Sequence, residues 1–212
     1  MSDQAPIRVL IAEDDPETRE LYSNLLSSLG HEVVAAAATG REAVDLAREH
    51  RPDVVLLDVH MPDMTGVEAA RAIAAEQPDV AIVLVTGDHE LSLTDEELDA
   101  SGARTLLGKP VQAKQLDSAL RLAVRKARVE AQLRREVADV RQTLEARKLI
   151  ERAKGILMRR TGSSEQEAYR ILQRTSQDKS MPMVDVAKAV INSEPGAHNG
   201  ARPAPPPPPP AA

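Results

Sequence analysis

Residues 54–66 of the chain read VVLLDVHMPDMTG: four consecutive apolar residues, followed at once by Asp58. An uninterrupted apolar run of this length is typical of a central strand that is buried on both faces. Such strands belong to parallel sheets covered by helices, and open sheets of this type place their chemistry beyond the carboxyl ends of the strands. Asp58 is therefore the first candidate functional residue.

The rest of the first half alternates short apolar runs with helical patterns. In Pro16–Leu29, leucines recur at helical spacing (Leu21, Leu25, Leu26, Leu29), and Gly30 supplies the stop. This alternation predicts an α/β fold with a doubly wound, five-stranded parallel sheet. The five predicted strands are Ile7–Ala12, Glu32–Ala36, Asp53–Asp58, Val80–Thr86 and Arg104–Gly108.

The composition excludes several classes of protein. The chain has 212 residues, of which 42% are apolar, so wholesale disorder is excluded. The absence of cysteine excludes disulfide scaffolds, thiolate metal sites and cysteine nucleophiles, and it fits a reducing compartment. No apolar run approaches the roughly 18 residues of a membrane span. Residues 1–6 lack an apolar signal region, so we expect a cytoplasmic protein without membrane contact.

The charge is divided unevenly along the chain. Residues 1–116 hold 9 basic and 22 acidic side chains, a net charge of −13, whereas residues 117–212 hold 18 and 11, a net charge of +7. Such asymmetry predicts two modules, the basic one suited to nucleic acid or a phosphorylated partner. Helices that are merely solvated and basic are the alternative.

The second half reads as helical. From Gln112 to about Arg160 there is no proline and only one glycine, which predicts a long helical segment, with an interruption near its middle left open. A coiled-coil seam with 4-3-4 spacing covers less than two heptads of it, so dimerisation through this seam is a hypothesis. The seam consists of Leu133, Val137, Val140 and Leu144.

Two shorter helices follow a break at Thr161-Gly162. Ser164 and Glu167 form a capping box that opens the first, with Ala168, Ile171, Leu172 and Thr175 on one face. Pro182 suits the first turn of the last helix, whose apolar stripe is Val184, Ala187, Val190 and Ile191. These helices predict a small three-helix bundle after a helical linker. Residues 194–212 are rich in proline, and we expect a disordered or polyproline II tail.

Polar residues gather at the predicted strand ends. Glu13–Asp15 follow the first strand, Asp58 ends the third, Thr86 ends the fourth, and Lys109-Pro110 follows the fifth. In a parallel sheet these positions lie at one edge, where neighbouring carboxylates repel one another unless a hard divalent cation such as Mg²⁺ neutralises them. A carboxylate flanked by Mg²⁺, a hydroxyl and an ammonium can accept a phosphoryl group.

The stretches VLIAEDDPETR, VVLLDVHMPDMTG, IVLVTG and LLGKP, in this order, resemble the response-regulator receiver domain over residues 6–128. The resemblance implies a flavodoxin-like fold, a histidine kinase as partner, and Asp58 as the phosphoacceptor. It also implies that Mg²⁺ is held by Glu13, Asp14, Asp58 and the backbone carbonyl of His60. Thr86 would be the switch hydroxyl and Lys109 the phosphate-pairing lysine, with a cis Lys109-Pro110 bond.

Two positions leave questions open within this resemblance. Receivers usually carry an aromatic residue three positions before the lysine, and this chain has Leu106 there. Coupling through the helix after Pro110 is therefore the alternative route to the output. The side chain of His60 could itself be a metal ligand or a phosphodonor, although only its backbone carbonyl is required.

The stretch RKLIERAKGILMRRTGSSEQEAYRILQRTSQ, residues 147–177, resembles the ANTAR domain, an RNA-binding output module of transcription antiterminators. The resemblance covers residues 133–193, merges with the linker at residues 129–150, and rests mainly on Ala153-Lys154-Gly155. RNA loops are bound by cations on phosphates and by stacking and polar groups on bases. The candidate RNA-binding residues are Arg147, Lys148, Arg152, Lys154, Gly155, Arg159, Tyr169, Arg170, Arg174, Ser176 and Gln177.

Several of these candidates have an ordinary structural alternative. Gly155 costs a helix about 1 kcal/mol relative to alanine, which close approach of RNA or of a neighbouring helix would explain. Tyr169 could stack on a base or pack between helices. Ser176 and Gln177 could contact base edges or end their helix.

These patterns together favour a non-enzymatic regulator that is activated by phosphorylation, binds RNA stem-loops and acts in transcription antitermination, with a phosphorylation-dependent homodimer as a further hypothesis. An aspartyl phosphatase is a rival, but Asp58-Val59-His60 lacks its second carboxylate. A receiver with a DNA-binding helical output, and a scaffold that dimerises through residues 112–150, remain as alternatives.

Overall fold

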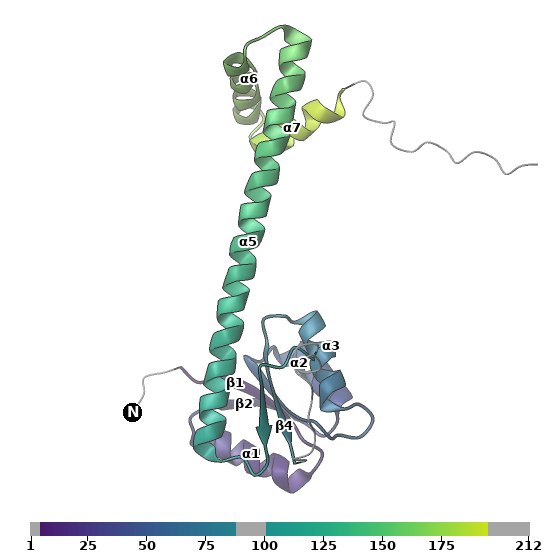
Figure 1. Cartoon of the computed structure of the whole chain (residues 1–212), viewed down its shortest axis with the longest axis vertical. Coiled ribbons are helices and arrows are strands. Elements are labelled where there is room, and N and C mark those ends of the chain that lie inside the picture. The colour runs from purple at the N-terminus through teal and green to yellow at the C-terminus, as the bar shows by residue number, and fades with distance from the viewer. Residues whose placement is uncertain (1–4, 88–100, 195–212) are drawn as a thin grey trace, which may run out of the picture. The chain divides into compact units, whose positions relative to one another are not determined.

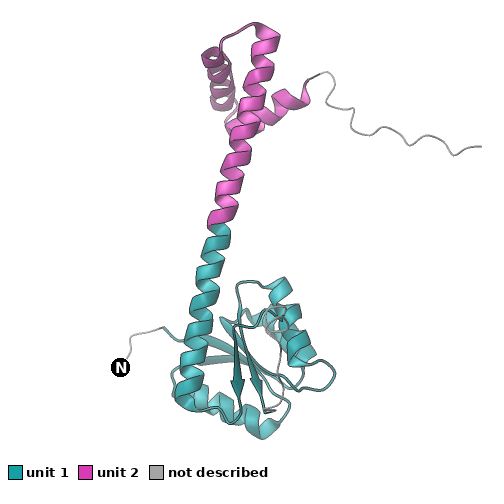
Figure 2. Ribbon diagram, in the orientation of Figure 1, with its two compact units in different colours: residues 1–135 teal, residues 136–212 magenta. Residues whose placement is uncertain are grey.

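The computed structural model describes residues 5–87 and 101–194 (Figure 1). The chain divides into two compact units, residues 1–135 and residues 136–212 (Figure 2). The proline-rich tail expected at residues 194–212 lies outside the described residues apart from Glu194. Among the helices of the described ranges, none has the length and hydropathy needed to span a membrane.

The first unit contains the expected parallel sheet, with the strand order β2-β1-β3-β4-β5. This order is that of flavodoxin-like folds, so the predicted fold class is confirmed. The chain adds β2 on one side of β1 and then β3, β4 and β5 on the other side. The connections that leave β1 and β3 therefore run to opposite faces of the sheet, and the carboxyl ends of these two strands flank a crevice. The strands are β1 Arg8–Ala12, β2 Glu32–Ala37, β3 Val54–Asp58, β4 Ala81–Thr86 and β5 Thr105–Gly108.

Helices cover both faces of this sheet, because successive strand residues point to opposite sides. Val9 and Ile11 of β1 pack toward α1 (Pro16–Ser28) and the first part of α5 (Ala113–Thr161). Leu10 and Ala12 pack toward α2 (Gly40–His50) and α3 (Gly66–Glu76). The core is aliphatic except for Tyr22 of α1, which is buried.

Helix α5 runs without interruption from Ala113 to Thr161, so the break that the sequence left open near its middle does not occur. In the second unit, its last turns pack with α6 (Glu165–Asp178) and α7 (Met183–Asn192). The apolar centre of this bundle consists of Ala153, Ile156, Leu172, Val186, Ala187 and Ile191. The predicted capping box of α6 is confirmed, since Ser164 and Glu167 each accept a hydrogen bond from the other's backbone N–H.

Three details of the helices differ from the sequence patterns. Leu21, one of the leucines at helical spacing, and Ile171, which the pattern groups with Ala168 and Leu172, are exposed. The buried stripes instead contain their neighbours Tyr22 and Leu172, because each residue turns a helix by about 100°. Pro182 is the N-cap of α7 and lies just before its first turn.

Gly66 opens α3 against the backbone of β3. Its N–H donates to the carbonyl of Val59 at 3.0 Å, and a Cβ atom at this position would overlap the carbonyl oxygen of Asp58. Gly155 in α5 differs, since a Cβ there would meet only Nη1 of Arg159, at 3.7 Å. The close contact between Gly66 at the start of α3 and the backbone of Asp58 and Val59 therefore holds the end of β3 in position.

We expect the substitution Gly66→Ala to lower the free energy of unfolding by about 2 kcal/mol or more, because backbone atoms of β3 would have to shift. Gly155→Ala is the control and should be neutral or stabilising by up to about 1 kcal/mol. Urea unfolding followed by circular dichroism measures both. Equal unfolding of the Gly66 variant and the wild type would contradict the assigned close contact.

Candidate functional site

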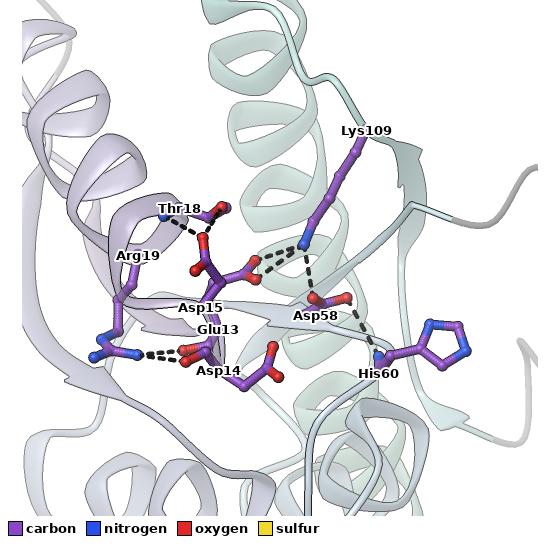
Figure 3. Close-up of polar contacts among 8 residues, drawn as sticks. All are labelled: Glu13, Asp14, Asp15, Thr18, Arg19, Asp58, His60 and Lys109. Atoms are coloured by element: carbon purple, nitrogen blue, oxygen red, sulfur yellow. Dashed lines mark hydrogen bonds and ion pairs between the residues drawn. The ribbon is translucent and has the colours of Figure 1, made fainter.

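The candidate phosphorylation site lies at the carboxyl edge of the sheet, where three strands bring charged residues together (Figure 3). Glu13 follows β1, Asp58 ends β3, and Lys109 follows β5. The Nζ atom of Lys109 donates to Oδ2 of Asp58 at 2.7 Å and to Oε1 and Oε2 of Glu13 at 3.0 and 2.8 Å. One ammonium thus bridges two carboxylates from adjacent strands.

Both bridged carboxylates are buried, since Glu13 is 2% and Asp58 6% exposed. Burial, reinforced by the charge of Asp58, raises the pKa of Glu13 to about 7, although the hydrogen bond from Lys109 acts to lower it. Burial acts to lower the pKa of Lys109, but the hydrogen bonds to Asp58 and Glu13 outweigh it, and that pKa is raised. When both carboxylates are ionised, one negative charge of the pair stays uncompensated.

A third carboxylate makes the cluster suited to a cation. Oxygen atoms of Glu13, Asp14 and Asp58 all lie within 4.8 Å of one another, and Asp14 is exposed to the solvent. They face an open crevice of about 620 Å³ that Lys109 and His60 also line. An all-oxygen set with uncompensated negative charge matches the ligands that Mg²⁺ prefers, so these residues fit the expected ion.

Asp15, the last residue of the acidic run, has a structural task. Its carboxylate caps α1 by accepting hydrogen bonds from N and Oγ1 of Thr18, at 2.8 and 2.5 Å. These hydrogen bonds lower the pKa of Asp15. Asp15 lines the same crevice, but its carboxylate is engaged with Thr18 and is not part of the three-carboxylate group (Figure 3).

The other predicted residues of the receiver site occupy distinct positions around the cluster. Thr86 ends β4 and is buried, and its carbonyl accepts a hydrogen bond from the N–H of Lys109 at 2.7 Å. The backbone N–H of His60 donates to Oδ1 of Asp58 at 3.3 Å, while its imidazole is exposed and points away from the carboxylates (Figure 3). The side chain of His60 is therefore not brought to the metal cluster.

The end of β5 shows one feature expected of a receiver and one departure from that family. The Lys109-Pro110 bond is cis, which confirms the expectation from the family resemblance. Leu106 is partly buried, pairs with Leu84 in the sheet register and packs into the core on the α2–α3 side.

The sequence analysis missed Arg19, which stabilises the acidic loop by hydrogen bonds to its backbone. Its Nη1 donates to the carbonyl oxygens of Glu13 at 2.6 Å and Asp14 at 3.3 Å (Figure 3). The available signal was its position in the second turn of α1, the helix that starts directly after the loop. Gly66 was also missed, although it closes the VVLLDVHMPDMTG stretch.

In the second unit, Lys154 differs from the exposed cations around it. It is only 7% exposed, and its Nζ contacts Oε2 of Glu151 at 2.8 Å and Oε1 of Glu165 at 2.7 Å. Hydrogen bonds to these two carboxylates raise the pKa of Lys154. The residue connects α5 to α6, and its ammonium is directed at carboxylates of the protein.

The remaining candidates on α5 are exposed to different degrees. Lys148 and Arg159 form surface ion pairs with Glu145 at 2.7 Å and Glu194 at 2.9 Å, which RNA phosphates could replace at little cost. Arg147 and Arg152 are exposed, and Gly155 is partly exposed. No neighbouring helix within the described ranges explains the glycine, because a Cβ there would meet only the Arg159 side chain.

The candidates on α6 lie mostly on its outer face. Tyr169, Arg170, Arg174 and Gln177 are exposed and line two hollows along the helix. Ser176 is directed elsewhere, since its Oγ donates to the carbonyl of Met181 at 2.5 Å in the turn before α7. The outer face of α6 therefore joins four of the predicted residues.

A parallel α/β unit with this carboxyl edge, followed by a basic helical unit, defines a response regulator with its output domain. Residues 9–121 match the family model of the response regulator receiver domain, and residues 138–191 match that of the ANTAR domain. The chain belongs to the response regulators and carries an ANTAR domain as its output. This architecture is that of a regulatory, non-enzymatic protein.

Similar proteins support this assignment, one over most of the chain and others over the receiver. The transcriptional regulatory protein PdtaR of Mycobacterium tuberculosis is 40% identical, over 89% of this chain and 91% of its own. The signal receiver domain of a modulated diguanylate cyclase from Desulfovibrio desulfuricans matches with a TM-score of 0.54 and 30% identity, over 59% of this chain and 98% of its own.

A second similar structure is a CheX–CheY–BeF₃–Mg complex from Borrelia burgdorferi, with a TM-score of 0.51 and 25% identity, over 55% of this chain and 87% of its own. Receiver domains typically bind Mg²⁺ at an acidic pocket, and this chain has such a cluster. A receiver domain implies a histidine kinase as partner, and an ANTAR domain implies RNA binding.

The raised pKa of Glu13 predicts how pH acts on stability without metal. Glu13 retains a proton in the folded unit between its ordinary pKa of 4.5 and about 7, whereas the unfolded chain has released it. Its contribution to stability is therefore present at low pH and lost as pH rises through about 7. Relative to the Glu13→Gln variant, the wild type should lose thermal stability between pH 5 and pH 8.

Thermal unfolding of both proteins in EDTA, at the two pH values, measures this difference. Glu17→Gln, which removes an exposed carboxylate of α1, is the control and should keep a constant difference from the wild type. A difference between wild type and Glu13→Gln that does not change with pH would contradict the assigned shift.

Proposed function

We propose that this chain is a phosphorylation-activated regulator that binds RNA stem-loops and acts as a transcription antiterminator. The observation that carries the proposal is the Lys109 ammonium bridging Asp58 and Glu13 beside Asp14, in one chain with a basic ANTAR domain. A protein that binds nascent transcripts works in the cytoplasm.

In the proposed reaction, Asp58 receives phosphate from a phosphohistidine of a cognate sensor kinase. A carboxylate oxygen of Asp58 attacks phosphorus, the P–N bond to the kinase imidazole breaks, and the imidazole nitrogen keeps the electron pair. Lys109 already lies 2.7 Å from Oδ2 of Asp58 and would neutralise charge on the transferred group, together with the hydroxyl of Thr86.

Mg²⁺ would be held by Glu13, Asp14, Asp58 and the backbone carbonyl of His60, and it would supply the positive charge that lets a dianionic group enter this acidic crevice. The similar CheY structure supports this part of the proposal, because it was obtained as a complex with BeF₃ and Mg.

The output step follows from the division of charge. The receiver half carries −13 and the second half +7, so only the second half attracts a polyanion. PdtaR, which is similar along nearly its whole length, is a transcriptional regulatory protein. Binding at hairpins that compete with terminators would convert phosphorylation into continued transcription.

A phosphorylation-dependent homodimer is part of the proposal. The seam residues of α5, Leu133, Val137, Val140 and Leu144, are 50–68% exposed. An exposed apolar stripe of this kind is typical of a contact surface, and a second copy of α5 would bury it.

Asp58→Asn should abolish phosphorylation and, with it, the gain in RNA affinity. Labelling by a phosphohistidine kinase in Mg²⁺ buffer, followed by electrophoretic competition of RNA hairpins against duplex DNA at fixed salt, measures both. Asp63→Asn, at an exposed residue of the same loop with φ of 66°, is the control and should behave as the wild type. Unchanged labelling of the Asp58 variant, or preference for duplex DNA, would refute the proposal.

Val140→Glu should prevent dimerisation of the phosphorylated protein, since it places a charge in the centre of the seam without disturbing a packed core. Light scattering after size exclusion measures the mass with and without phosphorylation. Gln142→Glu adds the same charge on the opposite side of α5 and should leave the dimer intact. A Val140 variant that still dimerises would exclude the seam as the interface.

A further inference from the structure

The outer face of α6 carries two hollows that lie side by side. The larger, about 800 Å³, extends from the α5–α6 turn along α6, and the smaller, about 410 Å³, lies next to Lys154 and Tyr169. Arg170 and Gln173 line both hollows and form the ridge between them.

The larger hollow is lined by polar groups that the protein itself does not use. Within the described residues, the side chains of Gln173, Arg174 and Gln177 have no hydrogen-bond or ion-pair partner. The one acidic residue of this hollow, Glu167, is engaged by the capping box, because its Oε2 accepts hydrogen bonds from N and Oγ of Ser164 at 2.8 and 2.9 Å. Free donors and amides therefore dominate its chemistry.

An apolar and an aromatic surface accompany these polar groups. Ile171 lines the larger hollow and is 40% exposed, and Tyr169 lines the smaller one and is 44% exposed. Unpaired bases of RNA loops are bound by stacking on such side chains and by hydrogen bonds to their edges. Glutamine amides can make two hydrogen bonds to one base, and guanidinium groups pair with phosphates.

We infer that the outer face of α6 reads the unpaired loop nucleotides of a bound RNA hairpin, with Gln173, Arg174 and Gln177 in the larger hollow. A further loop base would stack on Tyr169 in the smaller hollow, while Arg170 on the ridge contacts the backbone between them. This inference rests on the proposed RNA-binding function and assigns that function to one helix face.

The inference changes the role of Lys154 in the diagnostic Ala-Lys-Gly triplet. Its ammonium lies between Glu151 and Glu165, so it fixes α6 on α5 and thereby positions the reading face. Lys154 is a positioning residue under this inference, and the contacts to loop bases come from α6.

The test uses the full chain in its phosphorylated form and a library of RNA stem-loops with a fixed stem and a randomised loop. The hairpin that the wild type enriches most strongly then serves as the labelled probe. Arg174→Ala and Gln177→Ala should each weaken binding about tenfold or more, and Gln177→Ala should also accept loop sequences that the wild type rejects. Both side chains are exposed, so circular dichroism should remain unchanged.

Lys188→Ala on α7 is the matched control, because it removes an exposed cation outside both hollows. It should change affinity less than about twofold and leave the loop preference intact. Loss of affinity equal to that of the control, or an unchanged loop preference in Gln177→Ala, would overturn the assignment to α6.

The same experiment distinguishes a failure of the proposed RNA-binding function from a failure of the assignment to α6. If the wild type enriches no hairpin in either phosphorylation state, RNA binding itself fails. If it enriches hairpins while both α6 variants bind them like the wild type, RNA binding stands and the reading face lies elsewhere.

Discussion

The receiver depends on one ammonium group between two buried carboxylates. Glu13 and Asp58 come from the adjacent strands β1 and β3, and Lys109, which follows the edge strand β5, contacts both. Without it, two like charges would be buried a few ångströms apart, which a low-dielectric environment penalises strongly. Because the pair still leaves negative charge uncompensated, the same arrangement favours a divalent cation. Stability and chemistry at this edge are thus set by the same charge balance.

The second unit uses a similar arrangement for a different purpose. Lys154 also bridges two carboxylates, but both belong to helices of one bundle, and the pairing fastens α5 to α6. Its partners Glu151 and Glu165 are well exposed, so the pair tolerates more solvent than the receiver triad does. Lys154 belongs to the diagnostic Ala-Lys-Gly triplet, yet its ammonium is buried and paired with carboxylates of the protein. Burial thus distinguishes a lysine that holds two helices together from an exposed lysine that is free to contact a ligand.

Much of the receiver could be predicted because its signals are local. Apolar runs such as Val54–Leu57 give the strands, and parallel order then brings Glu13, Asp58 and Lys109 to one edge. The contacts made by Arg19 leave no pattern of residue types in the sequence, because its guanidinium donates to the backbone carbonyls of Glu13 and Asp14. Only its position in the second turn of α1 indicated that it lies near the loop. In the second unit, the pattern around Ile171 gave the helix but not its buried face, and the sequence does not reveal that Lys154 is buried.

The chain contains two tyrosines and no tryptophan, and the fold gives one tyrosine to each unit. Tyr22 is 4% exposed in the receiver core, whereas Tyr169 is 44% exposed on α6. Their near-ultraviolet signals consequently report on separate parts of the molecule. A quencher dissolved in the buffer has access to one ring only, so the native protein provides an intrinsic optical label on its output unit without any engineered fluorophore.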